Sequence, residues 1–317
     1  CLHDQPNWAA PHVDRWHRAD PVRPSPETTA AVRALRPPVD AVYTYDDYSI
    51  VAAAALAEDL GLPGLTRAVA ERARDKGALR AACAARGLPV PRFVRATRSA
   101  PPAIVDAVRR AGLRLPVVVK PAHGASSVLV RRADSAEALE EALGAYFEAV
   151  RTEPAAALWP DESLVVEEYL DGPEVDIDML VEDGVVRYAA VTDNFPPGPP
   201  YFMELGGQIP SSLPEEARAE LVGVASATLA ALGVGRACVH FEARWTDRGA
   251  VPIEANLRLG GAEVYDFNLA AYGVDLVEGG VRLALGLPLP TLRAEPTCFV
   301  HSVALTTQAA AVLQSEG

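Results

Sequence analysis

The stretch Glu254–Gly261 reads EANLRLGG, and it closes a predicted pair of antiparallel strands. The two strands are Arg236–Thr246 and Ala250–Ala255, and the residues between them, Asp247–Gly249, have the composition of a tight turn. Side chains alternate between the two faces of a strand, so polar residues spaced by two share one face. The pairing of these two strands therefore decides which polar groups meet.

Two glutamates are predicted to face each other across this pair. A three-residue loop places Thr246 opposite Ala250, and counting back then places Glu242 opposite Glu254. Like charges in directly opposed positions destabilise a sheet, whereas a divalent cation between them reverses the effect. Asn256 adds a neutral oxygen, and two carboxylates with one amide suit Mg²⁺ or Mn²⁺ better than zinc. The alternative is a solvated strand face on which the acids point into water.

A loop containing glycine and serine follows another predicted strand. Val117–Lys120 is apolar apart from its lysine, and the loop after it contains Gly124, Ser126 and Ser127. Glycine lets a backbone approach a ligand closely, and serine N–H groups and hydroxyls donate to phosphate oxygens. The loop lacks the GxxxxGK[ST] pattern of a P-loop. The alternative is an ordinary surface turn.

Three glutamates mark a further predicted strand and the turn after it. The segment Val166–Glu174 contains Glu167 and Glu168 and ends beyond a Gly-Pro pair. Taken alone, it is typical of a charged strand end followed by a turn. Lys76 precedes these segments on a predicted helix, where an isolated lysine is normally solvated.

Together, these segments resemble the ATP-grasp superfamily. The stretch that begins at Glu254 is similar to its ExNxRxGG signature, and the other marks occur in the same order between Asp75 and Leu287. The resemblance implies an α/β ATP-grasp fold. It also implies a ligase that uses ATP to activate a carboxylate as an acyl phosphate, joins it to an amine, and releases ADP and phosphate.

The resemblance assigns roles to the marked residues. It implies that Glu242, Glu254 and Asn256 hold the metal ion. It implies that either Glu167 or Glu168 accepts a hydrogen bond from the adenine amino group. The whole set implied for ATP binding is Lys76, Lys120, Gly124, Ser126, Ser127, Glu167, Glu168, Tyr169, Leu170 and Glu174, with Glu174 on the ribose hydroxyls.

The segment Phe202–Ser211 narrows the resemblance. It reads FMELGGQIPS and is similar to a stretch of L-amino-acid ligases and carnosine-synthase-like enzymes. The similarity implies that Glu204 holds a substrate amino group, with a plain loop carboxylate as the alternative. It also implies that Gly260 and Gly261 lie against the substrate, and that the enzyme forms dipeptides or related amides.

Two further side chains are expected to take part in catalysis. His240 lies two residues before Glu242 on the same predicted strand face, where an imidazole can donate to a developing oxyanion or orient a carboxylate. The alternative for His240 is a hydrogen-bonded core histidine. Arg258 can bind a carboxylate or a transferred phosphoryl group through two parallel hydrogen bonds.

Two other classes of protein remain open. One is a different ATP-grasp carboxylate ligase, of the kind found in nucleotide or biotin pathways. The other is an ATP-binding protein without turnover. The apparently complete metal set favours an enzyme.

Composition limits the partners. The 317 residues carry a formal net charge of −13, which disfavours a nucleic-acid partner held by phosphate contacts. No apolar run approaches the roughly 20 residues of a membrane span. The four cysteines are scattered, which predicts a reducing cytoplasm and neither disulfides nor a thiolate zinc site. The expected partners are amino acids and ATP, and the resemblance allows a homodimer.

The predicted domains follow from these segments. We expect residues 1–74 to form a partial doubly wound α/β (pre-ATP-grasp) domain that lacks its first strand. Residues 75–291 form the ATP-grasp region, with a small lid module at 92–170 and a metal-binding antiparallel sheet at 171–291. Residues 292–317 begin a C-terminal segment that looks truncated.

Two shorter strands complete the expectation. Val39–Thr44 is predicted as a strand, followed by a helix over Ser49–Leu60 that stops at Gly61. This strand–helix alternation is the basis for a parallel α/β arrangement at the N-terminus. Val128–Arg131 is predicted as the strand that follows the loop with Gly124, Ser126 and Ser127.

Overall fold

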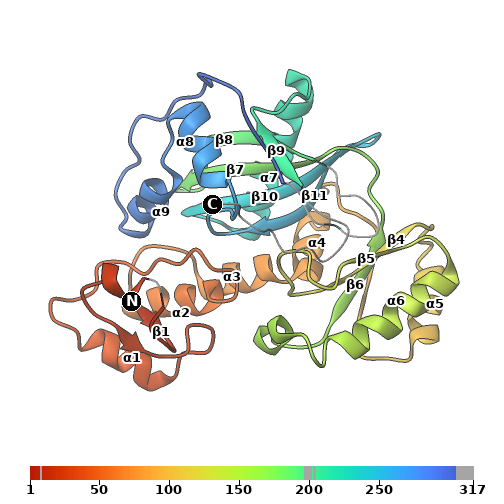
Figure 1. Cartoon of the computed structure of the whole chain (residues 1–317), viewed down its shortest axis with the longest axis horizontal. Coiled ribbons are helices and arrows are strands. Elements are labelled where there is room, and N and C mark those ends of the chain that lie inside the picture. The colour runs from red at the N-terminus through yellow and green to blue at the C-terminus, as the bar shows by residue number, and fades with distance from the viewer. Residues whose placement is uncertain (8, 196–201, 203–204, 305–317) are drawn as a thin grey trace, which may run out of the picture.

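The computed structural model describes residues 1–7, 9–195, 202 and 205–304. Its largest element is a six-stranded sheet (Figure 1). The strands are β7 (Glu174–Glu182), β8 (Val185–Asn194), β9 (Gly206–Ile209), β10 (Ala237–Thr246), β11 (Gly249–Asn256) and β12 (Val300–Val303). They are hydrogen-bonded in the order β11-β10-β7-β8-β9-β12, and every neighbouring pair is antiparallel.

Helices cover both faces of this sheet. One face packs against α3 (Arg67–Arg74), α4 (Lys76–Ala84) and α7 (Glu215–Leu232) around a core that includes Ile177, Phe241 and Leu221. The opposite face packs against α8 (Val264–Tyr272) and α9 (Leu276–Ala284), where Leu180 and Phe267 are buried together. Helices α8 and α9 do not cover the end of this sheet that carries Glu174 of β7 and Glu242 and Arg244 of β10. These side chains line a cleft.

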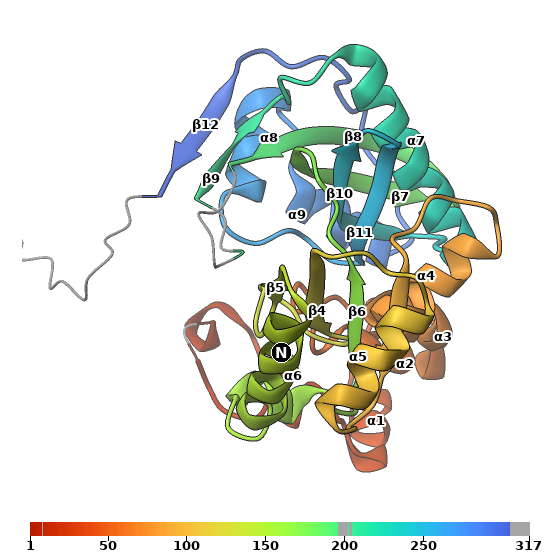
Figure 2. The same cartoon turned by 90° about the vertical axis from the view of Figure 1, so that its right-hand side faces the viewer.

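A second sheet has four strands and forms a separate layer (Figure 2). In hydrogen-bonded order, its strands are β3 (Phe93–Ala96), β6 (Leu164–Glu168), β4 (Val117–Pro121) and β5 (Arg131–Ala133). Two helices, α5 (Pro101–Arg110) and α6 (Ala136–Ala149), cover one face. Strand alternation buries Val117 and Val119 against these helices, and it directs Val118 and Lys120 to the other face.

The N-terminal part is built from short elements. A parallel pair of β1 (Leu2–His3) and β2 (His17–Arg18) precedes α1 (Pro26–Arg33) and α2 (Ile50–Leu60). The predicted helix that ends at Gly61 is confirmed. The strand predicted at 39–44 is wrong, because those residues pair with no strand in the part of the chain that the structure describes. Local apolarity does not supply the partner on which a strand depends.

The strand predicted at Val128–Arg131 is displaced. β5 begins only at Arg131, where it pairs with Val119 of β4. Ser126, Ser127 and Leu129 have φ angles of 53°, 53° and 59°, in the left-handed region that a continuous strand does not use. The loop after β4 is therefore longer and more tightly turned than the sequence pattern predicts.

The pairing of Glu242 with Glu254 is confirmed, but the predicted route to it is wrong. Thr246 pairs with Gly249, so the loop has two residues rather than three. A register shift between Glu242 and Ala243 inserts one extra residue into β11 and restores the predicted partner. The shorter loop and the extra residue in β11 each shift the register by one residue, in opposite directions, so the two shifts cancel at the glutamate pair.

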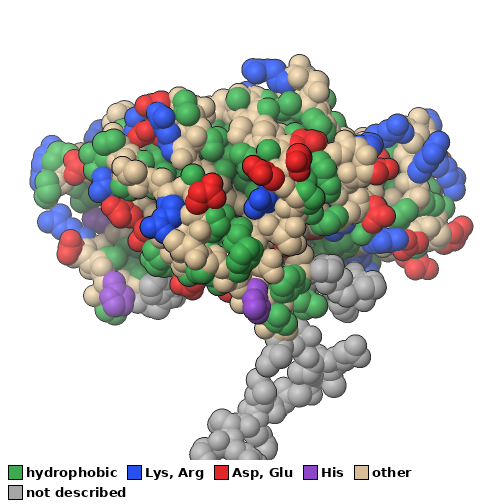
Figure 3. Space-filling view, turned by 90° about the horizontal axis from the view of Figure 1, so that it is seen from above, with side chains coloured by type: hydrophobic (Ala, Val, Ile, Leu, Met, Phe, Trp, Pro, Cys, Tyr) green, Lys and Arg blue, Asp and Glu red, His purple; other side chains and the backbone are tan. Residues whose placement is uncertain are grey.

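The surface carries charges of both signs. Figure 3 shows side chains of both charges scattered over one face, among hydrophobic and neutral ones. None of the helices that the structure describes is long and apolar enough to span a membrane. The four cysteines, all within the described ranges, are free thiols.

Candidate functional site: a cleft between the two sheets

A cleft lies between the four-stranded sheet and the uncovered end of the six-stranded sheet. Together with the solvent at its mouth it encloses about 870 Å³. Its walls come from α4, β4, the loop after β4, the end of β6, and the strands β7, β10 and β11. All ten residues implied for ATP binding line it, namely Lys76, Lys120, Gly124, Ser126, Ser127, Glu167, Glu168, Tyr169, Leu170 and Glu174.

Two buried lysines stand at the floor of the cleft. Lys76 is the first residue of α4, and Asp75 caps that helix by accepting from the next two backbone N–H groups. The Lys76 ammonium donates to the carbonyl of Gly124 at 2.9 Å and pairs with Glu254 at 3.1 Å. Burial lowers the pKa of Lys120. Both cations are thus pre-positioned for an anionic ligand, and Lys76 is not the solvated helix lysine of the alternative.

Glu167 forms a buried charge cluster that the sequence did not reveal. Lys120 pairs with one oxygen of Glu167, and Arg80 of α4 approaches the other at 3.2 Å. Although burial opposes ionisation, Arg80 and Lys120 hold the pKa of Glu167 below its ordinary value. An adenine amino group would have to compete with two cations for this carboxylate.

The segment after β6 is fixed by an arginine of β10. Arg244 donates through Nε to Glu174 at 2.9 Å and through Nη1 to the carbonyl of Leu170 at 2.6 Å. The guanidinium groups of Arg244 and Arg132 both lie over the Tyr169 ring, at 5.1 and 4.4 Å from its centroid. These contacts fix the backbone at Tyr169 and Leu170, which the resemblance implies for ATP binding.

Glu174→Ala is expected to raise the KM for ATP about tenfold and to leave the KM for the other substrates near wild type. A lost hydrogen bond between a carboxylate and a ligand hydroxyl has about this effect on binding. Steady-state kinetics with ATP as the varied substrate measures it. Glu182→Ala, at the far end of the same strand, is the matched control. An ATP KM equal to wild type would show that Glu174 only holds Arg244.

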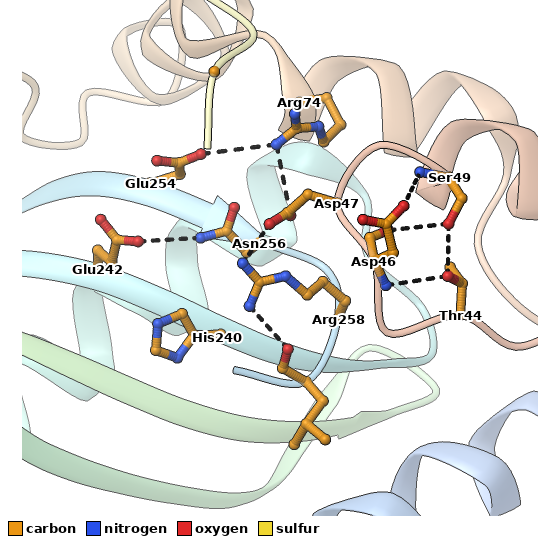
Figure 4. A network of polar contacts seen from close by, with 12 residues as sticks. Thr44, Asp46, Asp47, Ser49, Arg74, His240, Glu242, Glu254, Asn256 and Arg258 are labelled. Carbon is orange, nitrogen blue, oxygen red and sulfur yellow. Dashed lines mark hydrogen bonds and ion pairs between the residues drawn. The ribbon is translucent and has the colours of Figure 1, made fainter. Parts of the chain in front are cut away.

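The two facing glutamates occupy different electrostatic environments (Figure 4). Burial, Glu254 and Asp176 raise the pKa of Glu242 to about 8. Although burial opposes it, Lys76 and Arg74 lower the pKa of Glu254. Asn256 donates to Glu242 at 3.3 Å. The negative charge of Glu254 is therefore balanced by nearby cations, whereas that of Glu242 is balanced only in part. A divalent cation bound between the two carboxylates would balance the charge of Glu242.

Glu242→Gln is expected to raise the melting temperature of the metal-free protein, most strongly near pH 8. A carboxyl group whose pKa is raised on folding binds a proton that the unfolded chain releases, so stability falls as pH rises from about 4.5 to about 8. Glutamine has no such titration. Near pH 8, the free energy of unfolding of the variant should exceed that of wild type by on the order of 1 kcal/mol, the size of a cross-strand pair effect.

Thermal melts in a chelator at several pH values test this. Glu254→Gln is the comparison and should lower the melting temperature, because it leaves Lys76 without its carboxylate. Repulsion between the two acids taken alone predicts a slight stabilisation for Glu254→Gln, and the ion pair with Lys76 reverses that expectation. A Glu242→Gln variant that melts below wild type at pH 8 would contradict the expectation.

His240 is held between acids on the same sheet face. Its Nδ1 lies 2.9 Å from Asp178, and its Nε2 lies 3.8 Å from Asp176. Although burial opposes the charged form, Asp176 and Asp178 raise the pKa of His240 to about 10. An imidazolium at this place is a fixed internal cation next to Glu242. Both the functional and the core interpretation of His240 are compatible with this burial.

Arg258 joins the six-stranded sheet to the N-terminal part (Figure 4). It pairs with Asp47 and donates to the carbonyl of Leu259 at 2.8 Å. Asp47 also lies 3.5 Å from Arg74, which in turn is 4.0 Å from Glu254. Sequence patterns missed Asp47 and Arg74, because only the fold brings them to the signature stretch.

Three residues are predicted to bind the substrate, and the structure describes two of them, Gly260 and Gly261. Gly260 is required sterically, since a Cβ there would lie 2.7 Å from both His240 Nδ1 and a Val264 methyl. Gly261 has open space around it. Neither Gly260 nor Gly261 is among the residues lining the cleft, which leaves their substrate role a prediction. Glu204 lies outside the described residues.

The fold that encloses the cleft is an ATP-grasp fold. The model of the ATP-grasp domain family matches residues 113–266. The L-amino acid ligase from Bacillus licheniformis has a similar structure, with a TM-score of 0.76 and 24% sequence identity over 94% of this chain and 71% of that one. The predicted α/β ATP-grasp fold is confirmed.

Curated relatives of the chain have named activities. Carnosine synthase 1 of Gallus gallus is 31% identical over 270 residues, which are 83% of this chain and 29% of that protein. Alanine–anticapsin ligase of Bacillus subtilis is 27% identical over 293 residues, 85% of this chain and 60% of that protein. The chain thus spans about a third to three fifths of these relatives. It carries an ATP-grasp domain and resembles ATP-grasp amino-acid ligases, as predicted.

Proposed function

We propose that the chain binds ATP and Mg²⁺ in the cleft and joins an amino acid carboxylate to an amine, releasing ADP and phosphate. The observation that carries the proposal is the convergence of ten predicted ATP-binding residues with the glutamate pair of β10 and β11. The relatives, which are named as a synthase and a ligase of small molecules, support the same reaction class.

The residues of the cleft suit the parts of ATP. Lys76, Lys120 and the loop with Ser126 and Ser127 would contact the phosphates, where converging cations and backbone N–H groups stabilise transferred charge. The backbone at Tyr169 and Leu170 would bind the adenine. The positive groups gather locally, so the acidic net charge of the chain does not oppose phosphate binding.

Glu242, Glu254 and Asn256 fit a hard divalent cation. They offer two carboxylates and an amide at neighbouring register positions, and the raised pKa of Glu242 marks an uncompensated charge there. When bound, Mg²⁺ or Mn²⁺ would offset the charge of the phosphates. The chain itself holds Glu254 in place through Lys76.

The reaction follows from carboxylate chemistry. An oxygen of the substrate carboxylate attacks the γ-phosphorus of ATP, and the bond from that phosphorus to the oxygen of ADP breaks. The amine nitrogen then bonds to the acyl carbon, loses a proton, and displaces phosphate. Arg258 would bind the carboxylate, and the imidazolium of His240 would stabilise the tetrahedral oxyanion. Closure of the loop after β4 would exclude water, which otherwise hydrolyses the acyl phosphate.

Partners and location belong to the same proposal. The substrates are small molecules, with no nucleic acid or membrane involved, and the enzyme acts in the cytoplasm, where ATP is available. A homodimer is compatible with it.

The nucleotide product tests the proposal. Purified protein is incubated with ATP, Mg²⁺, hydroxylamine and single amino acids, then with amino acid pairs and with bicarbonate. ADP together with a hydroxamate supports an acyl phosphate, because hydroxylamine captures the activated acid. AMP and pyrophosphate would overturn it. Turnover with bicarbonate alone would favour another ATP-grasp carboxylate ligase, and ATP binding without any turnover would favour a binding protein.

A further inference from the structure

Four oxygen-bearing side chains form a row across the six-stranded sheet. Glu254 of β11 pairs with Glu242 of β10, Glu242 pairs with Asp176 of β7, and Asp176 pairs with Thr192 of β8. Directly paired residues share a face, and adjacent strands lie about 4.8 Å apart. Asp176 and Thr192 therefore continue the row of the proposed metal site by one and two strand spacings.

Thr192 has a buried hydroxyl that lacks a partner. The residue is 5% exposed, and its Oγ1 makes no hydrogen bond within the part of the chain that the structure describes. Its methyl group lies 3.3 Å from the place of a Cβ on Gly207 of β9. The staggered geometry of Cβ turns the hydroxyl away from that contact. Leaving a buried hydroxyl unsatisfied is costly, which points to a ligand at this position.

The neighbours of Thr192 define the kind of ligand. Asn194 donates its amide N–H to Asp176 at 3.0 Å, which turns the amide oxygen of Asn194 away from that carboxylate. Hydroxyl, carboxylate and amide oxygens are all acceptors, and an ammonium group presents three N–H donors and no acceptor. Glu242 within the row and Asp178 beside it carry carboxylates that disfavour an anion, and the His240 imidazole faces Asp176 at 3.8 Å from the other side.

We propose that Asp176, Thr192 and Asn194 form the subsite that binds the ammonium group of the accepting amine. The subsite rests on the proposed ligase function, and it adds a recognition element on β7 and β8 to the expected contact at Glu204. It places the amine one strand spacing from Glu242, and the bound ammonium group must lose a proton, for which the Asp176 carboxylate is the adjacent acceptor, before its nitrogen bonds to the acyl carbon. Phe267 of α8 and the Thr192 methyl group both lie close to Gly207, at 3.6 and 3.3 Å from the place of its Cβ.

The first test separates amine binding from acid activation. The probes are hydroxylamine and the pair of amino acids that gives the fastest ADP release in a panel of the twenty L-amino acids. Thr192→Val should raise the KM for the accepting amino acid about tenfold, the usual effect of losing a hydrogen bond to a charged group. Hydroxamate formation should stay within about twofold of wild type, because small hydroxylamine does not need the subsite. Thr192→Ser should restore the wild-type KM.

Matched variants exclude simpler explanations. Thr246→Val removes a buried threonine hydroxyl from the β10–β11 turn and should leave every KM unchanged. Asp176→Asn should raise the acceptor KM at least as much as Thr192→Val, without changing the KM for Mg²⁺.

Three outcomes would overturn the subsite. One is a wild-type acceptor KM in both Thr192→Val and Asp176→Asn. The second is a rise in the KM for Mg²⁺ instead, which would make Asp176 a metal ligand. The third is a wild-type protein that forms no hydroxamate with any amino acid, a distinct result that removes the proposed function and the subsite with it.

Discussion

Glu254→Gln is expected to lower the rate of ADP formation about 10²–10³-fold at saturating ATP and Mg²⁺. Loss of one preorganised charge contact in a site of phosphoryl transfer has an effect of this size. Glutamine keeps the volume and one oxygen but loses the charge that pairs with Lys76 and would bind the metal. A coupled assay of ADP release measures the effect.

Two comparisons sharpen this expectation. Glu263→Gln changes an exposed glutamate at the start of α8 and should retain wild-type turnover. Far-UV circular dichroism with ATP binding shows whether Glu254→Gln is folded, since its loss of the Lys76 pair is expected to reduce stability. A folded variant with turnover within about fivefold of wild type would remove Glu254 from the metal site.

The glutamate pair shows how far sequence reasoning reached. Strand alternation and turn composition predicted that Glu242 faces Glu254, and the structure agrees. The prediction succeeded although the loop is one residue shorter, because a bulge in β11 compensates. Bulges depend on how a strand fits its neighbours, so a single hairpin sequence does not determine them.

The missed residues share a physical cause. Asp47 meets Arg258 from 211 positions away in the sequence, and Arg80 meets Glu167 from 87 positions away. Local periodicity carries no information about such pairs, because the packing of distant elements creates them. Thr192 and Asp176 were likewise unremarkable in sequence, and only the order of β10, β7 and β8 aligns them with the glutamates.

The N-terminal region shows the opposite failure. A short apolar run at 39–44 had the composition of a strand and was assigned one, yet the described residues offer it no pairing partner. The helix of Ser49–Leu60 was predicted well, because its end signals are local: Gly61 at φ 68° stops it. Helices were thus predicted from their own sequence, whereas strands required knowledge of their neighbours.

Arg80→Met is expected to destabilise the folded protein by about 3–5 kcal/mol, the cost of removing one partner from a buried ion pair. Arg80 is fully buried, and its guanidinium lies 3.2 Å from Glu167, which also pairs with Lys120. Methionine fills much of the volume, so the loss is mainly electrostatic. Chemical denaturation measures it, and the ATP KM should rise because Glu167 and Lys120 line the cleft.

A double-mutant cycle separates charge from packing. If the charge pair causes the loss, Arg80→Met combined with Glu167→Gln should cost less than the sum of the two single changes by at least about 1 kcal/mol. Arg67→Met, which breaks an exposed pair with Glu71 on the neighbouring helix α3, should cost less than about 1 kcal/mol. Strict additivity in the cycle would show that Arg80 contributes through its volume. The cluster at Arg80 would then be a packing feature of α4, and a ligand of Glu167 would have to displace only Lys120.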